Sequence, residues 1–98
     1  MRNPIIDITM ASNIIASLPD EFNSHDFIRE FDHRHPDIYR SIIARYSLRS
    51  ETAEKARQKA HQQIGRFLLD FRRGFTPRIE KVGTIRDGNS IFAIWRKR

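Results

Sequence analysis

Five polar side chains on the segment 51–73 have the types and spacing to contact nucleic acid: Lys55, Gln58, Lys59, Gln62 and Arg66. At about 100° per residue these positions share one side of a helix, and Gln58, Gln62 and Arg66 follow one line along it. Glutamine can pair bidentately with adenine, arginine with guanine, and lysine with phosphate. The pattern predicts a helix face that enters a nucleic-acid groove. The open alternative is a solvated surface, because the same residues are common on inert helices.

Two further arginines, Arg73 on the same side of the helix and Arg86, extend the predicted contact. Arg73 ends the segment and Arg86 lies in a turn farther along the chain. We expect both, together with Lys55, to lie mainly against phosphates. The terminal run Arg96-Lys97-Arg98 is typical of a frayed basic tail.

Charge is unevenly distributed along the 98 residues. Residues 1–47 carry five Arg and seven acids, whereas residues 48–98 carry thirteen Lys or Arg and five acids, for a formal net charge of +6. Arg outnumbers Lys by fourteen to four, and the guanidinium fork suits phosphates and guanine edges. This asymmetry predicts a polyanionic partner for the second half, with a merely soluble basic protein as the alternative.

Signals for catalysis, cofactors and metals are missing from the sequence. It has no cysteine, no glycine-rich phosphate loop and no paired His/Glu zinc motif. The run from Asp32 to Asp37 contains His33 and His35, but its spacing matches no standard metal site and its arginines would oppose a cation. We expect His25 to be a surface residue and His61 to pack beside an apolar seam. The sequence therefore predicts a protein that is not an enzyme, with no cofactor and no metal.

Length and hydropathy predict one small domain covering residues 1–98. No apolar run approaches the length of a membrane span, and Asp7 interrupts the moderately apolar start, so we expect neither a membrane segment nor a signal peptide. The absence of cysteine fits a cytoplasmic location. Oligomeric state is left open.

The periodicity of apolar residues and the positions of proline, glycine and capping residues predict mostly helical structure with a C-terminal β-hairpin, an α+β fold. Helices are expected over 8–18, from Asn23 or Ser24 through Phe31, and after Pro36, where one helix is split or two are separated. The best-delimited helix covers 51–73, with Ser50 as its cap and Gly74 as a left-handed terminator. Residues 48–50 are expected to form a short connection, with a stub of strand as an alternative. The seam of that last helix comprises Ala53, Ala56, Ala60, Ile64, Phe67, Leu68 and Phe71.

Two β-rich runs, 79–85 and 90–95, flank the turn Arg86-Asp87-Gly88-Asn89. An Asp-Gly pair between such runs is a strong hairpin signal, although the register is not determined because two-residue and bulged turns differ by one position. We expect Trp95 to anchor the core.

Helices followed by a terminal two-stranded ribbon resemble the winged helix-turn-helix superfamily, by element order and without a signature motif. The resemblance implies a three- to four-helix domain in which the helix before the ribbon enters the DNA major groove and the ribbon touches the backbone. Carried over by position, these elements are 51–73 and the turn 86–89. A competing assignment makes the two helices around Pro36 the DNA-reading pair and exposes Arg40 and Arg45.

The sequence thus predicts a non-catalytic protein that binds duplex DNA, as a small bacterial or phage-like transcription regulator does. Two other partners are kept open. One is a protein partner in a larger assembly, docked on Leu69 and its neighbours, and the other is structured RNA.

Overall fold

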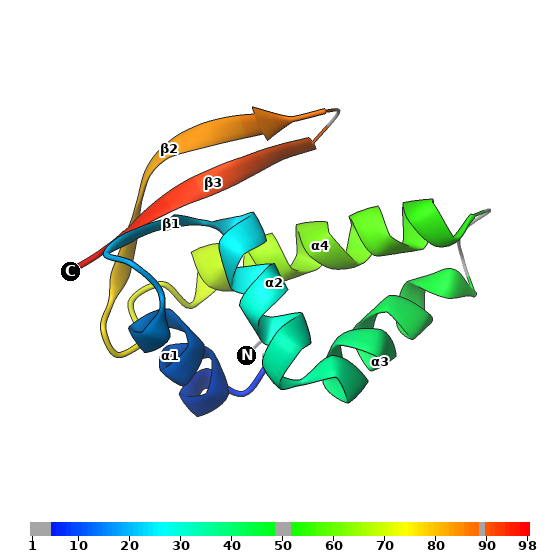
Figure 1. Ribbon diagram of the computed structural model, residues 1–98, viewed down its shortest axis with the longest axis horizontal. Coiled ribbons are helices and arrows are strands. Elements are labelled where there is room, and N and C mark those ends of the chain that lie inside the picture. The colour runs from blue at the N-terminus through cyan, green and yellow to red at the C-terminus, as the bar shows by residue number, and fades with distance from the viewer. Residues whose placement is uncertain (1–4, 49–51, 89) are drawn as a thin grey trace.

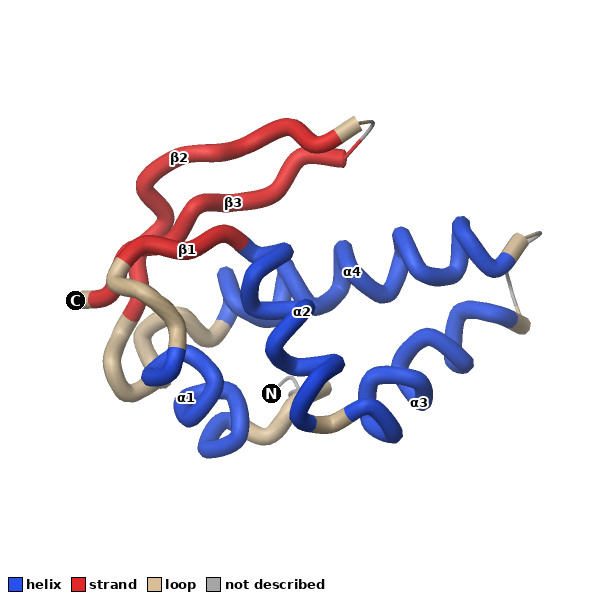
Figure 2. Tube along the Cα trace, viewed as in Figure 1, coloured by secondary structure: helices blue, strands red, loops and turns tan. Residues whose placement is uncertain are grey.

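The computed structural model describes residues 5–48, 52–88 and 90–98, which form four helices and a three-stranded antiparallel sheet (Figures 1 and 2). The α+β class predicted from the sequence is confirmed. The helices are α1 (Ile8–Ser17), α2 (Ser24–Arg34), α3 (Pro36–Ser47) and α4 (Ala53–Asp70), and the strands are β1 (Glu21–Asn23), β2 (Ile79–Asp87) and β3 (Ser90–Lys97).

The sheet contains a strand that the sequence did not predict. β1 pairs antiparallel with the end of β3, with Phe22 opposite Trp95, which gives the strand order β1-β3-β2. With only three residues, β1 is too short for an alternating pattern to reveal it. The strand suggested at 48–50 was placed wrongly at Leu48, which is the exposed C-cap of α3, and residues 49 and 50 lie outside the described residues.

The hairpin register is fixed by a two-residue loop. Asp87 pairs with Ser90, and Gly88 has a φ of 62°, a left-handed conformation that glycine adopts without steric cost. The ladder shifts between Lys81 and Gly83, so Val82 forms a bulge. Directly opposite residues point to the same face of a sheet, and the pairs Lys81–Trp95, Thr84–Ala93 and Arg86–Ile91 therefore share one face.

Caps and proline define the helices of the first half. At the start of α2, the Asn23 side chain accepts from the Asp26 N–H and the Asp26 carboxylate accepts from the Asn23 N–H, a reciprocal capping box. His35 is both the C-cap of α2 and the N-cap of α3, and Pro36 is the first residue of α3. Pro36 thus separates two helices.

Helix α4 is shorter at both ends than the predicted 51–73. Its cap is Thr52, whose hydroxyl accepts from the Lys55 N–H at 3.1 Å, while the predicted cap Ser50 and Glu51 lie outside the described residues. The helix ends at Asp70, so Arg72 and Arg73 lie in the following turn.

The prediction of a left-handed terminator at Gly74 was wrong, because Gly88 is the one described residue with positive φ. Other groups satisfy the last carbonyls of α4. The Arg72 guanidinium donates to the Leu69 carbonyl at 2.7 Å, and the Gly74 N–H donates to that of Phe71 at 2.8 Å.

The predicted seam of α4 faces the core, with Ala56, Ala60, Ile64, Phe67 and Leu68 all buried. Ala53, in the first turn of the helix, is exposed instead, and Phe71, directly after the helix, is half-buried.

Trp95 lies on the same core. It is 1% exposed, as expected of an anchor, and its indole N–H donates to the buried Ser24 hydroxyl at 2.9 Å. Sheet and helices therefore share one core, which includes Phe22, Phe27 and Phe31.

The C-terminal run is ordered, which corrects the expectation of a frayed tail. Lys97 is the last residue of β3, and its ammonium donates to the carbonyls of Ala16 and Leu18 at the end of α1. Arg98 forms a 2.6 Å ion pair with Glu80, and its N–H donates to the Arg78 carbonyl. Arg96 lies within β3 and its guanidinium is 3.6 Å from the Glu21 carboxylate, so all three terminal cations have structural contacts.

The two faces of α4 can be distinguished by one substitution on each. Ile64→Asp places an unpaired carboxylate at a fully buried position and should cost about 3 kcal/mol or more. For a domain of this size the melting temperature should fall by roughly 12 °C or more. Gln62→Asp, on the exposed face, should melt close to the wild type. Indistinguishable thermal melts of the two variants would show that the faces are assigned wrongly.

Candidate nucleic-acid interface

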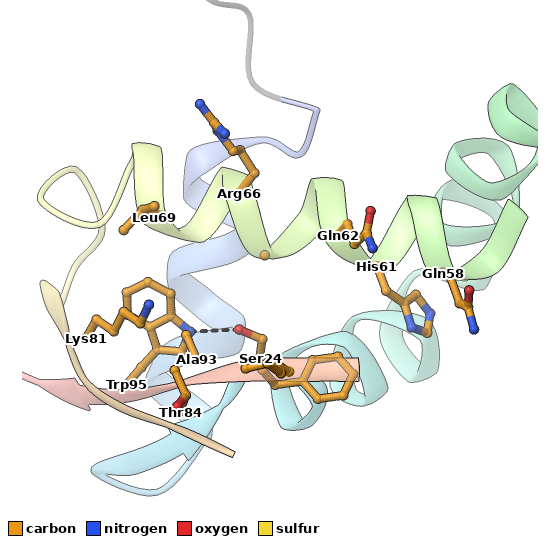
Figure 3. Close-up of a pocket in the computed structure, with 13 residues that line it drawn as sticks. Ser24, Gln58, His61, Gln62, Arg66, Leu69, Lys81, Thr84, Ala93 and Trp95 are labelled. Carbon is orange, nitrogen blue, oxygen red and sulfur yellow. Dashed lines mark hydrogen bonds between the residues drawn. The ribbon is translucent and has the colours of Figure 1, made fainter. Parts of the chain in front are cut away.

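A groove of about 520 Å³ runs between α4 and the β2–β3 hairpin (Figure 3). Figure 1 shows the hairpin extending over α4, with the start of α2 beside them. On the helix side the groove is lined by Gln58, His61, Gln62, Gly65, Arg66 and Leu69, and on the strand side by Lys81, Thr84, Ile91, Phe92, Ala93 and Trp95, with Ser24 below. Gly65 has open space where a Cβ would lie, so the helix backbone itself borders the groove.

The groove lining has an apolar floor and hydrogen-bonding groups beside it. Trp95 and Ala93 contribute to the floor, while Gln58, Gln62 and Lys81 supply side-chain donors and Arg66 lines the helix side. No carboxylate belongs to the lining within the part of the chain that the structure describes. The local charge is therefore positive, which favours an anionic occupant.

The structure brings together three of the seven predicted contact residues. Gln58, Gln62 and Arg66 line the groove, as expected from their spacing along one line of the helix. Lys55 and Lys59 are exposed on the same helix but lie outside the groove lining.

The other two predicted phosphate contacts lie at opposite ends of the hairpin. Arg73 lines a separate hollow at its base, and Arg86 lies near its tip. Arg86 is opposite Ile91 in the ladder, so the two share a face, and Ile91 lines the groove. The seven residues thus follow α4 and both ends of the hairpin instead of forming one cluster.

Arg66 has a partner that the sequence pattern did not reveal. Its Nε lies 3.8 Å from the Asp70 carboxylate, one helical turn away, and its guanidinium points away from the strands in Figure 3. The Arg66 side chain is 61% exposed, and ion pairs of this kind contribute little because water competes for both charges. The pair can therefore open in exchange for a phosphate or a base edge.

Sequence reasoning missed the strand side of the groove. Lys81 lies beside Trp95 in Figure 3, and Thr84 follows it along β2. Successive side chains of β2 point to opposite faces of the sheet. Only the pairing register decides which of the two sets faces α4. The alternating pattern of β2 therefore could not predict Lys81 and Thr84 as groove residues without the register.

One end of the groove contains a hydrogen-bonded aromatic pair. The His61 imidazole lies 2.6 Å from the Tyr39 hydroxyl. Burial lowers the pKa of His61 below its usual value, nearby His25 and Arg57 act in the same direction, and Asp32 opposes them. Burial also raises the pKa of Tyr39. This position agrees with the expectation that His61 packs beside the seam.

The expected surface location of His25 was wrong. Its ring is half-buried and meets the Phe92 ring edge-on, with centroids 5.4 Å apart. Its Nδ1 is buried and has no hydrogen-bond partner in the described part of the structure. The cause is the unpredicted β1–β3 pairing, which brings the first turn of α2 against β3.

The described residues offer neither a metal-binding cluster nor a membrane-spanning helix. Among them, no group of three or more His, Cys, Asp or Glu side chains is arranged to bind a metal ion. None of the helices in the described ranges has the length and apolar character needed to cross a bilayer.

Comparisons of this chain with family models, with curated proteins and with solved structures found no match.

The lowered pKa of His61 predicts how stability depends on pH. Below about pH 6.5 the unfolded chain takes up a proton on His61, while the folded chain resists protonation, so stability should fall as the pH decreases through this range. His61→Gln keeps a polar partner for Tyr39 but cannot titrate. Thermal melts between about pH 7.5 and about pH 5.5 should show a larger loss for the wild type than for this variant. Parallel losses would mean that His61 ionises equally in both states.

Proposed function

We propose that this protein binds duplex DNA without catalysis, with the exposed face of α4 in the major groove and the hairpin against the backbone. The observation that carries the proposal is the groove between α4 and the hairpin, whose described lining supplies donors and cations but no carboxylate. Such a lining favours a polyanion over a neutral or cationic partner.

The side chains on the exposed face of α4 support direct contact with the base edges of duplex DNA. Gln58 and Gln62 are exposed, and amide side chains pair bidentately with adenine in the major groove. Arg66 can pair with guanine in the same way once it leaves Asp70. Lys55 and Lys59, on the same helix, suit phosphates.

The arrangement of the elements is consistent with a winged-helix protein, and we propose that fold family on this basis. α4 directly precedes the hairpin along the chain, and the two line one groove. In the winged-helix resemblance the helix before the ribbon reads DNA and the ribbon contacts the backbone, roles that fall here on α4 and on Arg86. The competing assignment would use Arg40 and Arg45 on α3. Ion pairing does not separate the two assignments, because Arg40 lies 3.9 Å from Asp37 and Arg66 lies 3.8 Å from Asp70. We prefer α4 because its groove has no acidic lining residue in the described structure.

A protein partner is a second candidate, favoured by one specific observation. Leu69 is 39% exposed and Ile91 is 62% exposed, and both line the groove. Apolar side chains at such a site can dock a partner surface. The two candidates differ in salt dependence, because phosphate contacts weaken steeply with ionic strength and apolar docking does not. Structured RNA is a further partner that the same binding assay distinguishes from duplex DNA.

Two arginine substitutions test the assignment of roles. After a site selection, fluorescence anisotropy should show that Arg66→Ala costs about 1–3 kcal/mol on the preferred site and much less on random duplex, because base discrimination is lost. Arg86→Ala should weaken binding to both about equally and reduce the salt slope by about 0.9.

The matched control is Arg40→Ala, which removes the same charge from α3 and should leave binding unchanged. If Arg40→Ala weakens binding while Arg66→Ala does not, the DNA-reading pair is α2 and α3. If none of the three substitutions changes affinity for duplex DNA or duplex RNA, the protein-partner candidate replaces this proposal.

A further inference from the structure

A second hollow, of about 660 Å³, lies at the base of the hairpin beside the end of α4. We call it the basal hollow. Its lining includes five cations, namely Arg72, Arg73, Arg78, Lys81 and Arg98, with one carboxylate, Glu80, among the described residues. Only Arg73 among these was expected from the sequence to contact a ligand.

The cations of the basal hollow are only partly neutralised. Glu80 pairs with Arg98 at 2.6 Å, and Arg72 donates to the Leu69 carbonyl. Arg73, Arg78 and Lys81 have no ion pair with any carboxylate in the described structure. Three cations thus remain available around one hollow, and a bound anion would relieve their mutual repulsion.

Backbone hydrogen bonds hold these residues together from separate parts of the chain. The Ile79 N–H donates to the Arg72 carbonyl at 3.1 Å, and the Arg98 N–H donates to the Arg78 carbonyl at 2.8 Å. The turn after α4, the start of β2 and the end of β3 are thereby fixed beside one another. This convergence differs from cations that are scattered over a solvated surface.

The basal hollow adjoins the groove described above. Leu69 and Lys81 line both. A phosphodiester backbone that leaves the groove at Lys81 therefore meets Arg78 and Arg73 next. Guanidinium groups bind phosphate oxygens through two parallel hydrogen bonds, which a carboxylate-poor site with several arginines can supply.

We propose that the basal hollow is a phosphate-binding site that holds the DNA backbone next to the segment read by α4. This inference rests on the proposed function and adds a second contact region, with Arg78 and Lys81 as new ligands beside Arg73. It makes the protein contact a longer stretch of duplex than α4 and the hairpin tip alone.

The first test is the salt dependence of duplex binding. The double variant R73A/R78A removes two exposed arginines that lie outside the elements of the core. The slope of log affinity against log salt should fall by about 1.8, since each phosphate contributes about 0.9. The control R29A/R34A removes the same charge from α2 and should leave the slope unchanged. Equal slopes for the two double variants would overturn the inference even though duplex binding itself is observed.

A second test does not depend on DNA. Arginine Nε–Hε signals report directly on guanidinium contacts in NMR spectra of the full 98-residue chain. Tripolyphosphate should shift the signals of Arg73 and Arg78 saturably and leave that of Arg29 in place. Equal shifts of all arginines, or none, would overturn the phosphate site.

The two tests also separate this inference from the proposed function. If wild-type protein binds no duplex but tripolyphosphate shifts Arg73 and Arg78, the proposed function fails and the phosphate site stands. The last measurement is retention of the protein by vesicles of phosphatidylcholine and phosphatidylserine, because lipid headgroups carry the same phosphate chemistry. Retention by these vesicles without duplex binding would overturn the assignment of the site to DNA.

Discussion

The hydrogen bond from the Trp95 indole to the Ser24 hydroxyl joins the sheet to the helices at the centre of the molecule. Trp95 is opposite Phe22 in β1 and opposite Lys81 in β2, so it lies at the centre of the short stretch where all three strands pair. Ser24 is the first residue of α2, directly after the cap that starts this helix. A buried indole N–H needs a partner, and this requirement fixes where β3 crosses the start of α2. The position of the hairpin relative to α4, and hence the groove between them, depends on this contact.

Six of the eighteen lysines and arginines line the two hollows, while several carboxylates form ion pairs elsewhere on the surface. Asp37 and Glu30 pair with arginines of α3 and α2, and Glu21 pairs with Arg96 on the sheet. Among the described residues of the groove and the basal hollow, Glu80 is the one acid. Exposed ion pairs contribute little to stability. The proposed DNA partner, with its regularly spaced phosphates, would match this distribution of charge.

The same groove also has an apolar component, which suits a protein partner as well as a nucleic acid. Leu69 and Ile91 expose carbon surface, whereas Gln62 and Lys81 offer donors a short way along the groove. Nucleic acids present both phosphates and the apolar edges of sugars and bases, so a mixed lining does not conflict with the proposed DNA partner. His61 lines the groove and is hydrogen-bonded to Tyr39, so this half-buried pair links the groove to α3.

The sequence by itself determined the elements whose signals are local. Pro36 and the Asn23–Asp26 cap mark helix boundaries, the apolar seam defines the buried face of α4, and Asp87-Gly88 specifies the hairpin turn. These features depend on backbone geometry and on periodicity within a few residues, which a single sequence records. The alignment of Gln58, Gln62 and Arg66 along one side of α4 was predictable for the same reason.

Only the tertiary structure decided what this line faces. β1 is three residues long and exists because β3 offers a free edge beside it, which no local pattern encodes. The register of β2 determines that Lys81 and Thr84 turn toward α4, and a shift of one residue would have turned them away. The basal hollow joins residues from 69 to 98 through long-range backbone bonds. Local backbone geometry therefore determined the helices and the turn, while long-range pairing assembled the two hollows.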